Sequence, residues 1–154
     1  MEEFRAKMDD IEFTNTKFVL KFKSLDSPLA KKFLNAQAKG DGHGCSIYDG
    51  LMELKKTYLK TLHWSWYGFP QLRGPRTKSP IAIKYAIADL EEAERYLSHP
   101  SLRNNLMVTL MVVFISMKSS GSSNVLQYDQ FKFKSCVTLF HQKMKKCCLD
   151  LCKN

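Results

Sequence analysis

The sequence contains little glycine or proline and no long apolar stretch. Its 154 residues include seven Gly and five Pro, too few for a fibrous or low-complexity protein. The longest apolar run, residues 106–117, is about half of the roughly 20 residues that a membrane-spanning helix needs. Apolar residues make up 44% of the chain and aromatic residues 12%, which excludes a wholly disordered protein. We therefore expect one folded domain over residues 13–154, preceded by an acidic, flexible segment of residues 1–12.

Signals for export and for catalysis are also missing. The first residues are acidic and lack the apolar stretch of a signal peptide, and the five cysteines are an odd number. We expect reduced thiols and a protein that is not secreted. His43 and Cys45 share a glycine-rich loop, but a nucleophilic pair also needs a third, orienting group. The glycines from Gly40 to Gly44 lack the Gly-Lys-Ser/Thr ending of a phosphate-binding loop. The sequence therefore predicts neither enzymatic activity nor a cofactor.

A cluster of cysteines near the C-terminus leaves three interpretations open. Cys148 and Cys152 lie seven and eleven residues after His141, on one helical face where zinc could bind with help from elsewhere. The spacing matches no standard zinc finger, so we predict no metal. Cys147 and Cys148 also follow two lysines, and cysteines beside a basic run can be palmitoylated. Plain packing of the cysteines in a helix is the third interpretation, and the one that we favour.

Serine residues mark the starts of three predicted helices. Ser27 and Ser79 each precede a proline, and Ser46 precedes an apolar-periodic run. Serine is a favoured N-cap and proline a favoured first helical residue. The apolar spacing predicts helices that begin after these serines and end near residues 39, 66 and 98, and Gly40 is predicted to cap the first of them. A basic helix is predicted in the last part of the chain, where apolar residues recur at helical spacing from Phe133 to Leu151.

Two strands complete the predicted fold. Residues 14–23 alternate between apolar and polar side chains, the pattern of a half-buried strand. Residues 106–117 are apolar on both faces, which favours a strand covered on two sides. The predicted class is α+β, a single compact domain in which about four helices pack on a small, mostly antiparallel sheet. The predicted core includes Phe18, Leu20, Phe22, Leu54, Ile87, Leu110, Val112 and Phe140.

Positive charge is concentrated in part of the chain. The formal net charge is +9, and no Asp or Glu occurs in residues 54–88, whereas acidic residues gather in 1–12 and 89–94. A basic surface of this kind favours the binding of polyanions, because a purely solvating surface mixes charges of both signs. The alternative is that these charges only solvate the surface. The predicted polyanion-binding residues are Lys55, Lys56, Lys60, Arg73, Arg76, Lys78, Lys84, Lys143, Lys145 and Lys146.

The predicted order of elements begins with a strand at residues 18–22 and continues with an aromatic cluster and a basic loop, represented by Trp64, Trp66, Tyr67, Gly68, Arg76, Lys78 and Pro80. This order resembles that of the rhabdovirus matrix proteins, in particular those of plant-infecting members. The resemblance implies a non-enzymatic viral structural protein that binds anionic membrane and nucleocapsid or RNA and forms homo-oligomers. It also implies a location in the virion and in the host cytoplasm, in the nucleus or at the inner face of the membrane. A small RNA-binding protein, such as a viral suppressor of RNA silencing, is the alternative.

Overall fold

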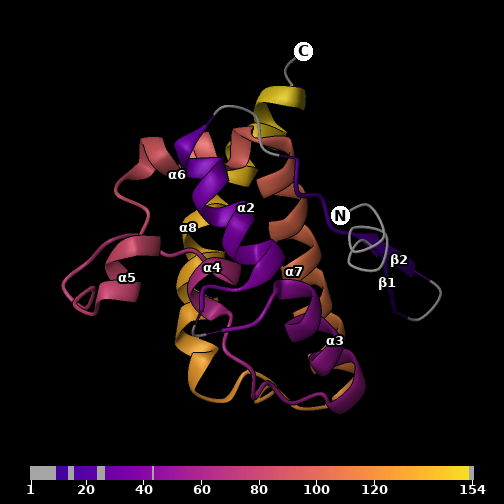
Figure 1. Ribbon diagram of the computed structural model, residues 1–154. Helices are drawn as coiled ribbons and strands as arrows, with labels where there is room; N and C mark the ends of the chain where they lie inside the picture. Colours follow the sequence, from indigo (N-terminus) through magenta and orange to yellow (C-terminus); the bar gives the residue numbers. More distant parts are fainter. Residues whose placement is uncertain (1–9, 14–15, 24–26, 43, 153–154) are drawn as a thin grey trace.

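The computed structural model describes residues 10–13, 16–23, 27–42 and 44–152, and over these residues the protein is mostly helical (Figure 1). A short N-terminal hairpin precedes the helices. The elements are β1 (Asp10–Phe13), β2 (Thr16–Val19), α2 (Pro28–Lys39), α3 (Ile47–Thr57), α4 (Ser65–Gly68), α5 (Pro80–Tyr85), α6 (Leu90–Ser98), α7 (Pro100–Ser120), the 3-10 turn η1 (Gln127–Asp129) and α8 (Gln130–Cys152).

The predicted α+β class is wrong. Within the described residues, β structure is limited to the antiparallel pair β1–β2, with Ile11 opposite Phe18, and an isolated bridge between Leu72 and Ile87. Residues 106–117, predicted as a strand buried on both sides, lie inside helix α7. A helix that is covered on most sides is also apolar around its circumference, so hydrophobic periodicity does not separate the two structures. Strand β1 begins at Asp10.

Helix α7 is the centre of the core. It packs against α2, α3, α6 and β2, and side chains such as Leu106, Val112 and Val113 are fully buried. It is the one helix among the described residues that is long and apolar enough to cross a membrane, but 56% of its most apolar window is buried in the protein. That burial is typical of a core helix. Pro100 opens α7, and the ring of His99 accepts a hydrogen bond from the Leu102 amide, so His99 caps this helix.

The three predicted serine caps are confirmed. The hydroxyls of Ser27, Ser46 and Ser79 accept hydrogen bonds from the amide three residues later, at 3.3, 3.1 and 3.2 Å. Gly40 follows α2 with a φ of 81°, a backbone conformation that favours glycine. The starts of these helices depend on local hydrogen bonds, which explains why a short sequence pattern was sufficient to predict them.

Two of the predicted helices are shorter than expected. The helix predicted to end near residue 66 stops at Thr57, and α4 is a separate turn. The helix predicted over 79–98 is divided into α5 and α6, because Ile87 lies between them in an extended conformation and forms a bridge with Leu72. The Ile87 amide donates to the Gln71 carbonyl at 2.8 Å, and the Arg73 amide donates to the Ile87 carbonyl at 2.7 Å. This bridge connects the basic loop before α5 to the segment between α5 and α6.

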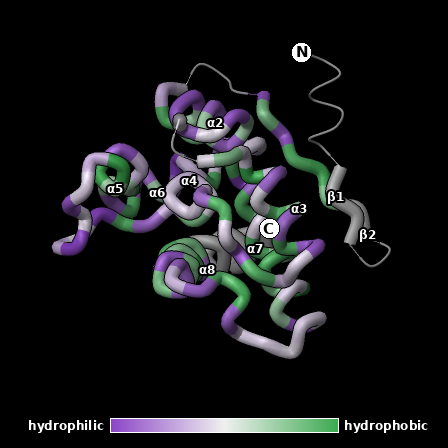
Figure 2. The backbone as a smooth tube through the Cα atoms, turned by 60° about the horizontal axis from the view of Figure 1, so that its bottom comes forward, coloured by the Kyte–Doolittle hydropathy of each residue, from purple (hydrophilic) through white to green (hydrophobic). Residues whose placement is uncertain are grey.

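The predicted core is largely confirmed. Six of the eight predicted residues are buried, and Phe18 and Phe22 are half-buried against the same cluster. The segment that follows β2 is held on α7 by Asn105. The side-chain oxygen of Asn105 accepts from the Lys21 amide, and its side-chain nitrogen donates to the Lys21 carbonyl. In Figure 2 the turns of α8 alternate between hydrophobic and hydrophilic residues, as expected for a helix with one buried face. Figure 1 shows α5 on the side of the molecule opposite to the β hairpin.

Candidate functional site

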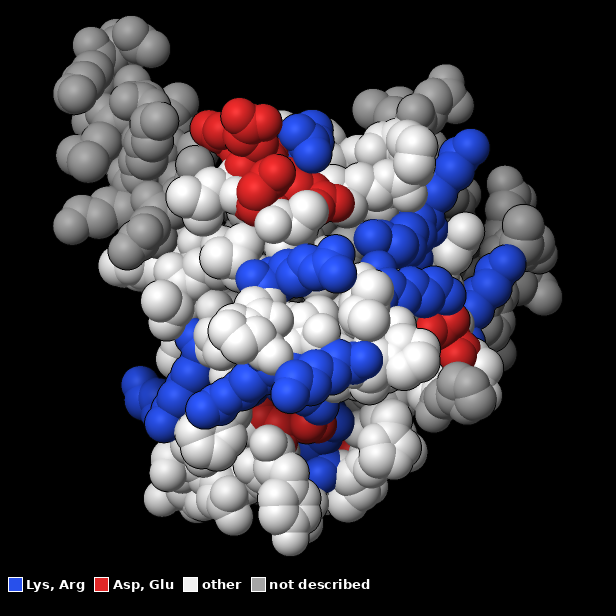
Figure 3. Space-filling view, turned by 90° about the vertical axis from the view of Figure 1, so that its left-hand side faces the viewer, with Lys and Arg blue, Asp and Glu red and all other residues white. Residues whose placement is uncertain are grey.

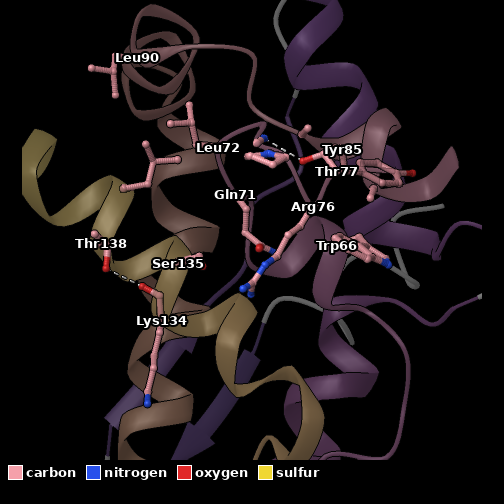
Figure 4. A pocket seen from close by; sticks show the side chains of 15 residues that line it. Trp66, Gln71, Leu72, Arg76, Thr77, Tyr85, Leu90, Lys134, Ser135 and Thr138 are labelled. Carbon is pink, nitrogen blue, oxygen red and sulfur yellow. Dashed lines mark hydrogen bonds between the residues drawn. The ribbon is translucent and has the colours of Figure 1, made fainter. Parts of the chain in front are cut away.

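A pocket of about 680 Å³ lies between the loop that precedes α5, α5 itself and α8 (Figure 4). Small-molecule sites usually have volumes of roughly 300–1,000 Å³. The lining side chains are mainly apolar or aromatic, with a few polar groups among them: Trp66, Gln71, Leu72, Gly74, Pro75, Arg76, Thr77, Ala82, Tyr85, Ala86, Leu90, Lys134, Ser135, Thr138 and Leu139. This volume falls within the range of small-molecule sites.

Two cations give this pocket a positive charge. Arg76 comes from the loop before α5 and Lys134 from α8, and no Asp or Glu is among the lining residues. In Figure 4, Gln71 and Arg76 extend toward the centre of the view from the loop, Trp66 lies on one side of them, and the side chain of Lys134 on α8 extends away from them. The planar guanidinium of arginine can form paired hydrogen bonds with a phosphate or carboxylate. The pocket therefore suits a ligand with an anionic group.

Gln71 supplies the most unusual polar group of the pocket. Its Nε2 atom is buried and has no hydrogen-bond partner. The backbone of Gln71 is fixed, because its carbonyl accepts the hydrogen bond from Ile87 and the next residue forms the bridge described above. A buried donor without a partner costs roughly 1–3 kcal/mol.

A second, smaller pocket of about 210 Å³ shares Trp66 with the first. Its lining includes His63, Ser65, Asp129 and Lys132. The Lys132 ammonium lies 4.2 Å from the centre of the Trp66 ring, a cation–π contact, and 2.8 Å from one carboxylate oxygen of Asp129. Lys132 therefore holds one wall of both pockets in place.

Asp129 is the hub of this smaller pocket. Its other carboxylate oxygen accepts hydrogen bonds from Lys60 Nζ and Ser65 Oγ, each at 2.6 Å. Burial acts to raise the pKa of Asp129, but the hydrogen bonds from Lys132, Lys60 and Ser65 outweigh it and lower the pKa to about 2. A carboxylate this acidic is a poor general base, so it does not activate Ser65 as a nucleophile. We interpret the cluster as a structural network.

The predicted polyanion-binding cations do not form one set. Lys60 is 5% exposed and paired with Asp129, so it is not part of an exposed basic surface, and Lys84 pairs with Asp41 at 3.1 Å. Arg73, Arg76 and Lys78 are exposed in the loop before α5. Lys55 is half-buried and Lys56 exposed on α3, and the side chains of Lys143, Lys145 and Lys146 lie outside the described residues. On the face that carries α5, basic side chains form bands, one group of acidic side chains forms a patch above them, and other acidic side chains lie directly beside the bands (Figure 3).

The structure describes only some of the residues for which the sequence suggested a nucleophilic cysteine, a zinc site or palmitoylation. Cys45 is half-buried, and burial together with the charge of Asp49 raises the pKa of its thiol to about 11, which disfavours a reactive thiolate. His43 and the side chains of Cys147, Cys148 and Cys152 are outside the described residues, so the interpretations of that cluster remain open. Among the described residues, no three His, Cys, Asp or Glu side chains are placed to hold a metal ion.

Sequence reasoning missed most of this site. Arg76 was predicted, but Gln71, Trp66 and Lys134 were not predicted to line a common pocket. Gln71 and Lys134 are separated by more than sixty positions and carry no local motif. Their proximity depends on how α8 packs beside the loop, and a single sequence contains no signal for that packing.

Comparison with known proteins corrects the viral interpretation. Residues 29–150 match the model of a family described as "Protein of unknown function (DUF1810)". The fold is similar to the crystal structure of the conserved hypothetical protein Rv1873 from Mycobacterium tuberculosis, with a TM-score of 0.59 and 35% sequence identity over 73% of this chain and 74% of that chain. No curated protein matches. The resemblance to rhabdovirus matrix proteins and the alternative of a viral silencing suppressor are both wrong, since the chain matches this family and a bacterial structure instead. The chain belongs to the DUF1810 family.

Proposed function

We propose that this protein binds a small ligand that combines an apolar, ring-containing part with an anionic group, in the pocket between the loop before α5 and α8. The observation that carries the proposal is the combination of mainly apolar and aromatic walls with two cations and no carboxylate in one cavity. Apolar walls with a few well-placed polar groups are typical of small-molecule sites. The excess of positive charge selects for an anion.

Binding without catalysis is part of this proposal. The residues that line the pocket include no His, Cys, Asp or Glu. These are the side chains that most often act as general acids, general bases or nucleophiles. Lys134 is the one lining amine, and it is exposed on α8. A receptor or carrier of an anionic metabolite therefore fits these residues better than an enzyme does.

The proposal is tested with 1-naphthyl phosphate, which carries a flat apolar ring and a phosphate, and with 1-naphthol as the uncharged analogue. Calorimetric titration of the full chain should detect binding of the phosphate and much weaker binding of the alcohol. Arg76→Ala should weaken phosphate binding by about tenfold or more, because charge-assisted hydrogen bonds contribute roughly 1.5–3 kcal/mol. Lys134→Ala should have an effect in the same direction.

The chain offers matched controls in the same loop. Arg73 and Lys78 are exposed and lie near Arg76 in sequence, but neither lines the pocket. Arg73→Ala and Lys78→Ala remove the same charge and should leave the affinity for 1-naphthyl phosphate within about twofold, because neither side chain can contact a ligand in the pocket and their longer-range effect is screened. Equal losses in all four variants would contradict a pocket and favour a diffuse charge effect. Absence of binding to the unmodified protein would contradict the proposed function itself.

A further inference from the structure

We propose that one end of the protein is a surface that contacts an anionic lipid membrane. This end is formed by the loop after α3 and by the segment that leads into α8. Five large apolar side chains are exposed there, and we call this set the apolar end: Tyr58, Leu59, Leu62, Tyr128 and Phe131. Exposed apolar side chains that gather in one place mark a surface that binds a membrane or another protein. None of the five lines either pocket, so the proposal is independent of the proposed function.

Hydrogen bonds hold the two segments of the apolar end side by side. The Lys60 amide donates to the Val125 carbonyl at 2.7 Å, and Gln127 Nε2 donates to the Lys60 carbonyl at 2.8 Å. In Figure 1 both segments lie at the lower end of the molecule. Tyr128 and Phe131 are three positions apart across the start of α8, a spacing that places side chains on one helical face. The fold therefore brings apolar side chains from two distant segments to the same end.

The aromatic side chains of the apolar end project from the surface. Tyr128 is 94% exposed and Phe131 is 75% exposed. A protein partner would need cavities shaped for these two rings, whereas the fluid interface of a membrane admits them without preformed cavities. Tyrosine is suited to that interface, because its ring is apolar and its hydroxyl group can remain in contact with water. The projection of these side chains therefore favours a lipid surface over a protein.

The backbone at the apolar end carries side chains at positions that favour glycine. Among the described residues, Tyr58 and Gln127 are the non-glycine residues with a positive φ, at 56° and 52°. A bulky residue in this conformation is strained, and strain of this kind gathers at functional sites. The Gln127 side chain is used within the fold, since it binds the Lys60 carbonyl. Tyr58 caps the C-terminus of α3 and is 37% exposed, which favours a role for its ring in binding.

The charges around the apolar end suit an anionic lipid. Lys56 is exposed in the last turn of α3 and Lys118 in the last turn of α7, and both helices end at this part of the molecule. The nearby carboxylates are engaged within the protein, because Glu53 accepts from backbone amides of the loop and Asp129 pairs with Lys60. Figure 3 shows few charged side chains at the lowest part of the molecule. Membrane affinity rises with the apolar area that is buried and with electrostatic attraction to anionic lipid.

The test is flotation of the full chain with two kinds of vesicle, one of equimolar phosphatidylcholine and phosphatidylserine and one of phosphatidylcholine alone. We expect the protein to bind the first kind and to bind the second much more weakly, and added salt should weaken the binding. Lys56→Ala with Lys118→Ala should lower the partition coefficient by about tenfold or more, because each lysine near an anionic surface contributes roughly fivefold. Lys31→Ala with Arg95→Ala is the charge control, since both residues are exposed on other helices.

Apolar variants test the side chains that would enter the interface. Tyr128→Ser with Phe131→Ser should lower partitioning into the phosphatidylserine vesicles by about tenfold or more, because two aromatic side chains lose their burial in lipid. The control is Met107→Gln with Met111→Gln, which removes two exposed apolar side chains from the middle of α7. Tyr58→Gly should also weaken binding while the midpoint of urea unfolding stays close to that of the unmodified protein, because glycine relieves the positive-φ strain.

Three outcomes would overturn the proposal. The first is that the unmodified chain does not bind the phosphatidylserine vesicles, or binds both kinds of vesicle equally. The second is that the Tyr128/Phe131 double variant and its methionine control bind with the same affinity, both with circular dichroism spectra of the folded protein. The third comes from sedimentation velocity without lipid. A dimer that becomes a monomer in the Tyr128/Phe131 double variant would show that the apolar end joins two copies of the chain instead.

Discussion

The Lys60 ammonium lies 2.6 Å from a carboxylate oxygen of Asp129, although the two residues are 69 positions apart in the sequence. Only 3% of the Lys60 side chain and 18% of the Asp129 side chain are exposed. The ammonium also donates to the Leu62 carbonyl and lies 5.2 Å from the centre of the Trp64 ring. This ion pair joins the segment after α3 to the start of α8, directly beside the smaller pocket.

The first prediction is that breaking the Lys60–Asp129 pair strongly destabilises the fold. Lys60→Ala leaves a largely buried carboxylate with one cation fewer, and removal of one member of a buried pair costs roughly 3–5 kcal/mol. The free energy of unfolding, measured by urea denaturation at neutral pH, should fall by about that amount. Lys56→Ala is the control, because Lys56 is exposed on α3 and its removal should cost less than about 0.5 kcal/mol. Equal effects of the two substitutions would contradict a structural role for Lys60.

The second prediction concerns acid. The pKa of Asp129 is lowered from 3.8 to about 2 in the folded protein. A lowered pKa means that the charged carboxylate contributes stability above its unfolded-state pKa, and this contribution is lost as the pH falls through the folded pKa. Between pH of about 5 and about 2, the unmodified protein should therefore lose on the order of 1–2 kcal/mol more stability than Asp129→Asn does.

The measurement is urea denaturation of both proteins at several pH values in this window. Asp49→Asn is the matched control, because Asp49 is an exposed carboxylate in the first turn of α3. Its stability should follow that of the unmodified protein as the pH falls. Parallel curves for Asp129→Asn and the unmodified protein would show that Asp129 does not carry the acid sensitivity.

The third prediction is that two glycines are required by the packing of Trp64. This indole is 1% exposed and lies between Gly50 on α3 and Gly68 at the end of α4. A Cβ atom at either glycine would overlap the indole ring. Gly50→Ala and Gly68→Ala should each lower the free energy of unfolding by about 1–3 kcal/mol, the usual cost of overpacking.

A third glycine provides the control for these substitutions. Gly74 has no atom within 4 Å of its added Cβ position. Gly74→Ala should leave stability unchanged or raise it by up to about 1 kcal/mol, because alanine reduces the entropy of the unfolded chain. Thermal or urea unfolding of the three variants checks the prediction, and a stable Gly50→Ala protein would show that α3 and Trp64 can separate.

The fourth prediction retains the basic loop from the sequence analysis. Changing Arg73, Arg76 and Lys78 to Glu should lower the salt concentration at which the protein elutes from heparin, used as a generic polyanion, because exposed clustered cations bind polyanions with strong salt dependence. The control changes Lys21, Lys31 and Lys118 to Glu, three exposed cations on other elements, for the same change of net charge. Equal shifts in both proteins would mean that net charge alone determines retention.

Local features of this protein were predictable from its sequence. The caps at Ser27, Ser46 and Ser79 depend on hydrogen bonds that span three residues, and Gly40 adopts the positive φ expected after α2. Leu20, Leu54 and Phe140 were placed in the core from hydrophobic spacing alone. These features follow from interactions within one helix or strand, and such interactions are contained in a short stretch of sequence.

The fold class and the site were decided by tertiary structure. Residues 106–117 have the composition of either a buried strand or a buried helix, and the packing of α2, α3 and α6 around them determines that they form α7. Lys60 looks like any surface cation in the sequence, and the approach of Asp129 turns it into a buried structural residue. Gln71 lines the pocket together with residues of α8 because the adjacent bridge between Leu72 and Ile87 fixes the backbone of this segment. Each of these outcomes depends on contacts between segments that are distant in the sequence. A local sequence pattern does not reveal the free energy of such contacts.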